Sequence, residues 1–288
     1  MINKTAVTIG KFDGLHLGHA KIIKTMKEIS DKYNLQPVVF SFCPAPAEYL
    51  TGEKAKSIYT GDEKTLLLTE MGVEKEIKYP FAEIKNMPPD EFIEEILIKK
   101  INCGAIIIGA GFKFGRDKSG DADALAVICE KHGLIFNEIE PVERGGRVSS
   151  SRIKELLASG EINKANALLG RPYSISGAVR RGKQLGREIG FPTANIAAPD
   201  EKFLPRLGVY KTTVIYKDEA FVGVTNLGVN PTVSGDAIMC ETHIPGFGGD
   251  IYGERIRVDF REFIRGESRF GSVEDLRRQI ERDVEYIL

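Results

Sequence analysis

The chain contains 288 residues, of which 42% are hydrophobic and 28% charged, a composition typical of a globular protein long enough for two domains of ordinary size. Its 40 Lys and Arg residues against 41 Asp and Glu residues leave a net charge of −1, which gives no electrostatic basis for nucleic acid or an anionic membrane as a partner. Four scattered cysteines without a C-x-x-C pair argue against a zinc knot or a disulfide framework and fit a reducing cytoplasm, and the N-terminus lacks the pattern of a signal peptide.

The first half of the chain predicts alternating strands and helices. Apolar runs predict strands at residues 6–9, 37–42, 75–79, 105–108 and 134–139. Helical patterns lie between them, at residues 15–32, 62–71, 88–100 and 121–132. Because runs such as 105–108 are apolar throughout, we expect a sheet buried on both faces, as in a parallel sheet with helical crossovers. Ligands of such sheets bind beyond the carboxyl ends of the strands.

Residues 8–19, TIGKFDGLHLGH, lead from the first strand into the first helix. Gly14 permits a tight turn, and Asp13 can cap the free N–H groups of the helix. His16 and His19 are three residues apart, so both rings should project from one side of the first helical turns. A helix N-terminus suits a phosphate, and two imidazoles add donors where charge builds on a transferring phosphoryl group. The alternative is that both histidines only pack or cap, but two of the 4 histidines of the chain within four residues favour a function.

This spacing resembles the H-x-G-H signature of α/β nucleotidylyltransferases. The longer form G-x-F-D-G-x-H-x-G-H is similar to the bacterial riboflavin kinase/FAD synthetase family. The resemblance implies that His16 and His19 are catalytic in nucleotidyl transfer. It also implies contacts of the same segment with the ATP phosphates, through Gly10, Phe12, Asp13 and Gly18.

A glycine-rich segment, GAGFKFG at residues 109–115, follows one of the predicted strands. It does not match a dinucleotide fingerprint, because the last glycine is one residue late and Lys113 and Arg116 stand where an apolar helix should begin. Two cations and two aromatic rings favour anion contact and ring stacking, so we predict Phe112 and Phe114 as flavin contacts. The alternative is a plain surface loop.

Residues 147–157, RVSSSRIKELL, predict another helix start with Ser149 or Ser150 as N-cap. Hydroxyls followed by Arg152 and Lys154 can hold a triphosphate, and a serine cap beside solvated basic residues is the alternative. The pattern resembles the I-S-S-T-x-x-R motif of the same superfamily, which implies phosphate binding by Ser149, Ser150 and Lys154.

Three positions depart from the family pattern in this half of the chain. Ala45 occupies the position of the His in the family pattern F-x-P-H-P. Gly111 occupies the position of the Asp in the pattern D-F-x-F-G. Lys154 replaces an Arg, which keeps the charge but loses the bidentate fork.

The second half of the chain has a different pattern of predicted secondary structure. A helix at residues 162–169 ends where Gly170-Arg171-Pro172 breaks the pattern, and we therefore predict a first domain of residues 1–169 and a second of residues 170–288. Alternating strands at residues 173–179, 208–215, 221–228, 238–244 and 254–260 indicate an antiparallel sheet or small barrel, closed by a helix at residues 272–288.

Residues 177–184, GAVRRGKQ, nearly match a phosphate-binding P-loop. Gln184 supplies no hydroxyl for Mg²⁺, however, and Gly186 and Gly190 disfavour the helix that a P-loop requires.

Residues 177–195 instead resemble the riboflavin kinase signature G-x-V-x-x-G-x-x-x-G-R-x-x-G-F-P-T-A-N. The resemblance implies ATP contacts at Gly177 and Gly182 and a flavin contact at Arg187. Thr193 and Asn195 would share one face of a strand, and their neutral oxygens suit a Mg²⁺ that also holds ATP phosphates. A polar strand edge is the alternative.

Glu241 and His243 also fall on one strand face. In the family the Glu of E-x-H is the catalytic base, and a primary hydroxyl is a poor nucleophile that needs a carboxylate within hydrogen-bond reach. Arg265 and Glu267 match the segment F-x-R-x-E, which implies flavin contacts. Asn230 stands where G-x-R-P-T has an Arg.

The sequence therefore predicts an α/β chain: a Rossmann-like, parallel-sheet nucleotidylyltransferase domain followed by an antiparallel β-barrel riboflavin kinase domain with a terminal helix. The implied function is bifunctional, with ATP and Mg²⁺ converting riboflavin to FMN and ADP, and FMN to FAD and pyrophosphate. Two alternatives stay open: a monofunctional riboflavin kinase with a degenerate N-terminal domain, and a non-catalytic flavin-binding protein. The expected location is the cytoplasm, and no oligomeric state is predicted.

Overall fold

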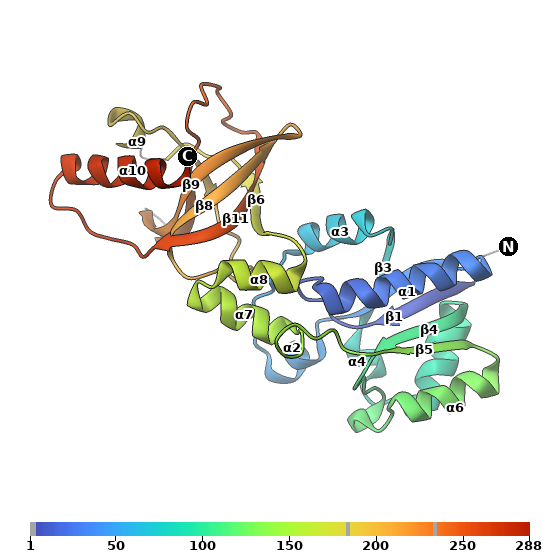
Figure 1. The fold of residues 1–288 in the computed structure, drawn as a ribbon. Helices are drawn as coiled ribbons and strands as arrows, with labels where there is room; N and C mark the ends of the chain where they lie inside the picture. Colours follow the sequence, from blue (N-terminus) through green and yellow to red (C-terminus); the bar gives the residue numbers. More distant parts are fainter. Residues whose placement is uncertain (1–3, 183–184, 233–234) are drawn as a thin grey trace. The chain divides into compact units, whose positions relative to one another are not determined.

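The computed structural model describes residues 4–182, 185–232 and 235–288 of the chain. It divides into two compact units, Met1–Ser150 and Ser151–Leu288, each built on its own sheet (Figure 1). Lys183 and Gln184, which belong to the near match to a P-loop, lie outside the described residues. Within the described part of the chain, none of the helices combines the length and the apolarity needed to cross a bilayer.

The N-terminal unit holds a five-stranded sheet in the order β3-β2-β1-β4-β5. All neighbouring strands are parallel, as the apolar runs predicted. The strands are β1 (Thr5–Ile9), β2 (Gln36–Cys43), β3 (Lys75–Pro80), β4 (Cys103–Gly109) and β5 (Ile135–Ile139). The strand order reverses beside β1, so the segment that follows β1 lies at the position where open parallel sheets bind ligands.

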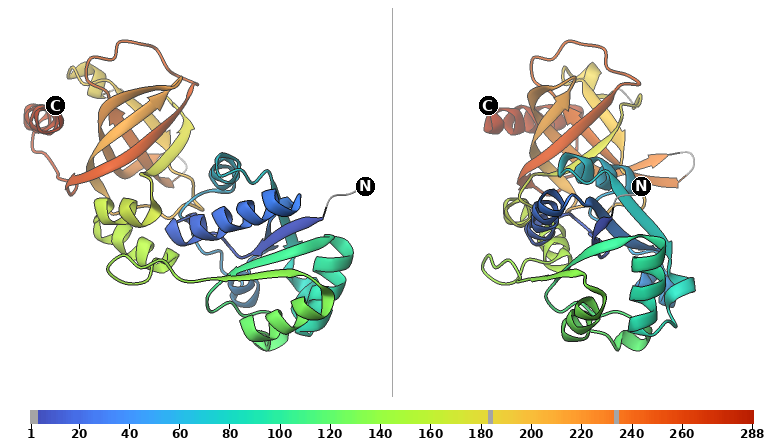
Figure 2. Two further views of the ribbon diagram at one scale, coloured as in Figure 1. Left: turned by 45° about the vertical axis from the view of Figure 1, so that its right-hand side comes forward. Right: turned by 90° about the vertical axis from the view of Figure 1, so that its right-hand side faces the viewer.

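Helices connect these strands and cover both faces of the sheet (Figure 2). They are α1 (Leu17–Tyr33), α2 (Pro46–Thr51), α3 (Gly61–Glu70), α4 (Phe81–Ile84), α5 (Pro89–Glu91), the π-helix η1 (Phe92–Lys100), the 3₁₀ turn η2 (Arg116–Lys118) and α6 (Ala122–His132). The single helix predicted at residues 88–100 is therefore two elements. In η1 the backbone bonds span five residues, as where Ile101 N donates to Ile96 O at 3.1 Å.

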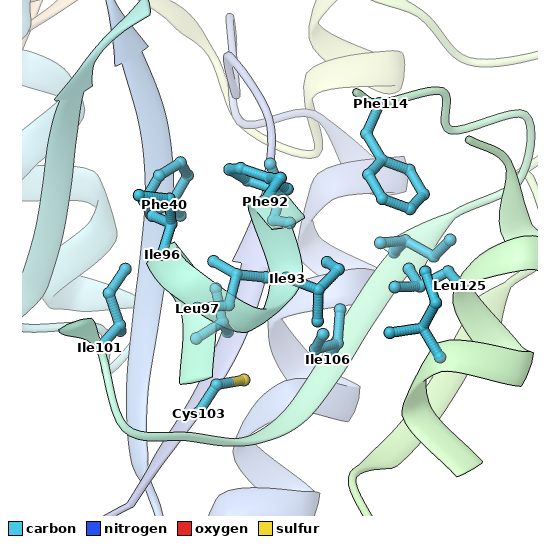
Figure 3. Close-up of a cluster of buried hydrophobic side chains, with 14 of the residues drawn as sticks. Phe40, Phe92, Ile93, Ile96, Leu97, Ile101, Cys103, Ile106, Phe114 and Leu125 are labelled. Carbon is cyan, nitrogen blue, oxygen red and sulfur yellow. The ribbon is translucent and has the colours of Figure 1, made fainter. Parts of the chain in front are cut away.

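Alternating residues of the buried strands supply two separate hydrophobic layers. On one face, Val7 and Ile106 pack against η1 and α6, and Figure 3 shows Ile93, Leu97 and Leu125 converging there. On the other face, Ala6 and Ile107 pack against α1 and α3. Burial of both faces explains why these strands are apolar throughout.

The C-terminal unit holds a six-stranded antiparallel sheet in the order β6-β11-β8-β9-β10-β7. The strands are β6 (Tyr173–Ala178), β7 (Thr193–Ala197), β8 (Gly208–Tyr216), β9 (Glu219–Thr232), β10 (Gly235–His243) and β11 (Arg255–Arg265). Arg180 N donates to Asn195 O at 2.8 Å, which brings the chain after β6 against β7. The sheet is therefore curled into a half-barrel, in agreement with the predicted antiparallel barrel.

Among the described residues, four helices accompany the second sheet: α7 (Ser150–Ser159), α8 (Ile162–Leu169), α9 (Leu185–Glu188) and α10 (Val273–Ile287). Asn166 of α8 donates to Phe260 O at 2.8 Å and accepts from Tyr173 N at 2.7 Å. The helix α8 was predicted to close the first domain, whereas in the structure it belongs to the second compact unit. The functional division at residue 169 stays a prediction.

Gly186 and Gly190 were expected to prevent a helix after residue 184, but a short helix forms there. One helical turn, α9, forms although it contains Gly186. It ends before Gly190, whose φ of +90° is open to glycine but strained for other residues. A long helix of the P-loop kind is therefore absent between residues 185 and 192.

Candidate active sites

The helix α1 begins at the histidine motif, but its cap is not the predicted residue. His16 is the N-cap, and its Nδ1 accepts from the His19 N–H at 3.4 Å. Asp13 Oδ1 instead accepts from Ile58 N at 2.7 Å. Phe12 and Leu15 both have positive φ, so the chain makes an additional turn that carries the Asp13 carboxylate away from the helix. The prediction of Asp13 as the cap is therefore wrong.

The two histidine rings lie together, as their spacing predicted. They are stacked, with centroids 3.7 Å apart and planes 15° apart, and the Phe12 ring packs on His19 at 4.8 Å. Two glycines make room for these rings: a Cβ at Gly18 would lie 3.1 Å from the His16 ring, and one at Gly10 would lie 3.2 Å from the Phe12 ring. The glycines and Phe12 thus fix the imidazoles, while direct phosphate contact by these three residues stays a prediction.

Both imidazoles are held in the neutral form. Burial lowers the pKa of His16 to about 4, although the Asp13 charge opposes the shift. Burial, with smaller effects from His16 and Lys64, lowers the pKa of His19 well below its ordinary value. Because His16 Nδ1 accepts a hydrogen bond, the neutral ring carries its proton on Nε2 and offers an N–H donor there.

The lowered pKa of His16 predicts acid sensitivity of the N-terminal unit. Between pH 6.5 and about 4 the unfolded chain binds a proton that the folded site excludes, so stability falls as the pH falls through this window. The loss for His16 reaches on the order of 3 kcal/mol at pH 4. Thermal unfolding of the wild type and His16→Asn at pH 7 and pH 5 measures this. Asn keeps a capping oxygen without titrating, so its melting temperature should fall less; an equal fall in both proteins would contradict the assignment.

The serine motif meets the histidine motif within the N-terminal unit. Ser150 Oγ donates to Asp13 O at 2.7 Å, and Val148 O lies 4.0 Å from the position of a Cβ on Gly18. Ser149 directly precedes α7. Lys154 lies one helical turn beyond Ser150, in the second compact unit, where its Nζ is 5.6 Å from the centre of the Phe203 ring. The phosphate roles of these residues stay predictions.

The two phenylalanines of the loop after β4 differ in exposure. Phe114 is only 7% exposed and belongs to the hydrophobic layer under the sheet, where it contacts Phe92 (Figure 3). Phe112 stacks on Phe114 at 5.6 Å and is half-buried. Because a buried ring offers no face to a ligand, the structure favours a packing role for Phe114, and Phe112 is the better candidate for a flavin contact.

A cavity of about 220 Å³ adjoins the motif loop and is called cavity A. Its lining includes Lys11, Ala45, Lys64, Glu76 and Lys78. Lys64 Nζ donates to Glu76 Oε1 at 2.6 Å and to Lys11 O at 2.9 Å, and Ser41 Oγ donates to the same carboxylate oxygen at 2.7 Å. Burial acts to raise the pKa of Glu76, but Lys64, Ser41 and Lys78 lower it overall.

This charged network leaves little trace in the sequence. Lys64 looks like an ordinary surface residue of an amphipathic helix, and Glu76 like the outward position of an edge strand. The pairing of α3 with β3 across the sheet edge creates their contact.

The C-terminal unit contains a larger cavity, cavity B, of about 500 Å³. Gly182, Thr193 and Asn195 line it, as does Arg187, which was predicted to contact flavin. Gly177 is not among its lining residues: a Cβ there would lie 2.4 Å from Ile196 Cγ2. The structure thus gives Gly177 the role of letting β6 approach β7, rather than a place at the cavity.

Thr193 and Asn195 lie side by side on β7, as predicted. Asn195 is 5% exposed, and its Nδ2 donates to Thr193 Oγ1 at 3.1 Å. A Cβ at Gly182 would lie 3.1 Å from the Asn195 amide, so glycine leaves open the space in front of this side chain. The hydroxyl and amide oxygens are hard, neutral donors, and the arrangement fits a Mg²⁺ that shares phosphate oxygens.

Glu241 lies beside this pair because of the strand register. In the antiparallel pairing of β10 with β7, Glu241 is opposite Asn195 and His243 is opposite Thr193, so all four side chains share one face. His243 Nδ1 lies 2.9 Å from Pro192 O, and because a carbonyl oxygen only accepts, Nδ1 is the donor.

Glu241 and His243 line a third cavity, cavity C, of about 300 Å³. Its wall also includes Asn226 of β9 and Leu276 and Ile280 of α10, so it combines polar groups with an apolar side. Thr193 lines both cavity B and cavity C. The two cavities therefore adjoin at Thr193, on the strand paired with the one that carries Glu241.

The two residues predicted from F-x-R-x-E line cavity C in different ways. Arg265 forms a bidentate pair with Asp283 of α10, at 3.0 and 2.6 Å, and Asp283 is 4% exposed. This pair ties α10 to the sheet. Glu267 is exposed, and its carboxylate lies directly against Gly228 of β9. A Cβ at Gly228 would lie only 2.1 Å from Glu267 Oε1, so a larger residue there would displace the carboxylate. Flavin contact by Arg265 and Glu267 stays a prediction.

Comparisons with known proteins match both units. The family model described as FAD synthetase matches residues 1–152, and the one described as riboflavin kinase matches residues 169–288. The fold and these matches define a two-part transferase, with a nucleotidyltransferase-like unit and a kinase unit.

Several curated relatives carry both parts in one chain. This chain is 37% identical to a bifunctional riboflavin kinase/FMN adenylyltransferase of Haemophilus influenzae, over 97% of this chain and 92% of that protein. Proteins of the same name from Escherichia coli K12 and Listeria monocytogenes are 35% and 31% identical, over 96% and 98% of this chain and 90% of each relative. The chain belongs to the family of bifunctional riboflavin kinase/FMN adenylyltransferases.

A solved structure supports the fold along the whole chain. It is described as a macrolide-efflux protein from Streptococcus pneumoniae, is 29% identical, and has a TM-score of 0.86 with 100% of this chain and 97% of that chain covered. The activity in that description is said of that protein only. The structural likeness supports the two-part α/β and antiparallel fold.

Proposed function

We propose that this chain catalyses two consecutive reactions: phosphorylation of riboflavin to FMN by residues 170–288, and adenylylation of FMN to FAD by residues 1–169. Both activities of the family imply ATP as a substrate. The observation that carries the kinase assignment is Thr193, which lines cavities B and C with Glu241 on the neighbouring strand.

In the kinase step, ATP phosphates occupy cavity B and the flavin occupies cavity C. The ribityl 5′-hydroxyl attacks the γ-phosphate, the bond from this phosphorus to the β,γ-bridging oxygen breaks, and ADP leaves. Glu241 accepts the hydroxyl proton. Thr193 and Asn195 would hold Mg²⁺, which neutralises phosphate charge when bound. The remaining residues orient the two substrates, which is most of what phosphoryl transfer requires.

In the adenylyl step, an FMN phosphate oxygen attacks the ATP α-phosphate, and pyrophosphate leaves. This nucleophile is already anionic near neutral pH, so the site needs positioning and charge neutralisation more than a base. The neutral imidazoles of His16 and His19 supply hydrogen-bond donors at the N-terminus of α1. Ser149 and Ser150, at the end of the same compact unit, would add further phosphate contacts.

One incubation tests the proposal against its alternatives. Purified protein with riboflavin and Mg-ATP should yield both FMN and FAD, resolved by chromatography. FMN alone would support a monofunctional kinase, and unchanged riboflavin would support a flavin-binding protein without turnover. The match of both family models favours the two-activity outcome.

A further inference from the structure

Asn230 is an unassigned residue that contacts the proposed catalytic base. Its Nδ2 donates to Glu241 Oε1 at 3.1 Å, from the neighbouring strand β9. In the antiparallel register Asn230 is opposite Ala237, four residues before Glu241. The amide therefore reaches along the sheet face to the carboxylate, rather than bonding to its direct cross-strand neighbour.

The face of β9 that carries Asn230 has no side chain at Gly228. Asn226, Gly228 and Asn230 share one face of the strand, and Gly228 has no side chain between the two amides. The Glu267 carboxylate occupies the space over Gly228. Glu267 and Glu241 both line cavity C.

Two donors that line cavity C are bonded to groups other than Glu241. The Arg265 guanidinium bonds to Asp283 and to Gly266 O. The His243 Nδ1–H donates to Pro192 O. Asn230 thus supplies Glu241 with a neutral donor from a strand whose position is fixed on both sides by its neighbours.

We propose that Asn230 is a positioning residue of the kinase step, whose amide N–H holds the Glu241 carboxylate where it accepts the proton of the flavin's primary hydroxyl. This inference rests on the proposed kinase function. It also accounts for the departure at this position. Asn and the Arg of the family pattern differ in charge and length, but both offer N–H donors to a carboxylate.

The test compares variants of the full chain in riboflavin phosphorylation. Asn230→Leu keeps the branching at Cγ but removes the donor, and should lower kcat about tenfold with the KM values for riboflavin and ATP nearly unchanged. Asn230→Arg restores donors and should recover most of kcat. Val229→Ala, on the opposite face of the same strand and 47% exposed, is the matched control with wild-type kinetics.

The outcomes separate this inference from the function on which it rests. Wild-type kcat in Asn230→Leu, or equal impairment of the Leu and Arg variants with unchanged thermal unfolding, would overturn the positioning role while the wild type still forms FMN. A wild-type chain that forms no FMN would overturn the proposed kinase function and the inference together.

Discussion

Replacing Glu241 by Gln stops FMN formation while the conversion of FMN to FAD continues. Gln has the shape of Glu, and its amide oxygen can still accept from Asn230, but it cannot take the proton of the attacking hydroxyl. Loss of a general base lowers kcat by about 10²–10⁴-fold. The measurement uses two reactions of the same preparation, riboflavin with Mg-ATP and FMN with Mg-ATP, with the flavins separated by chromatography.

A second carboxylate on the same sheet provides the control. Glu219 begins β9, is exposed and lines neither cavity B nor cavity C, so Glu219→Gln should form FMN at the wild-type rate. Loss of both activities in a folded Glu241→Gln variant would contradict the assignment of two separate sites. Unimpaired FMN formation would remove Glu241 from the chemistry.

The sequence predicted most strands of both sheets, though not β7 in the list of strands, because burial leaves a strong local pattern. The apolar run around Ile106 is buried on both faces and lies in a parallel sheet. In the second half, alternation around Glu241 placed the base and His243 on one face. Both inferences need only the period of side chains along a strand.

Contacts between distant segments were not predictable in this way. Asp13 was expected to cap α1 because it precedes the helix, yet its partner is Ile58, 45 residues away. Likewise, Asn230 was visible as a departure, but its contact with Glu241 depends on the register of β9 against β10. A pattern along one segment carries no information about such a register.

Burial of individual side chains was also beyond the sequence patterns. Phe112 and Phe114 stand two residues apart and looked equivalent, but Phe114 is buried in the hydrophobic layer beside Phe92, whereas Phe112 packs against that layer and is half-buried. A Cβ at Gly120 would lie 2.7 Å from the Phe114 ring, so the loop closes over this residue. The fold of the loop, and not its composition, decides which ring remains accessible to a ligand.

Replacing His16 by Ala or by Asn abolishes FAD synthesis while FMN production is retained. In the folded protein the neutral His16 ring offers an Nε2–H donor beside His19 at the start of α1. Removing one preorganised donor from a developing negative charge costs about 10²–10³-fold in kcat. The rate of FAD formation from FMN and Mg-ATP measures this loss, and riboflavin phosphorylation by the same variant is the internal control.

The Asn variant separates catalysis from the structural role of His16. Asn is a good N-cap, so its side-chain oxygen can accept from the His19 N–H that His16 Nδ1 contacts in the wild type. If His16 only caps the helix, Asn should preserve FAD synthesis and Ala should lose it through local destabilisation. If the imidazole acts on the ATP phosphates, both variants should lose it equally, although the Asn protein keeps wild-type thermal stability at pH 7. Full activity of His16→Asn would therefore assign His16 to the cap alone and leave His19 as the catalytic candidate on this turn.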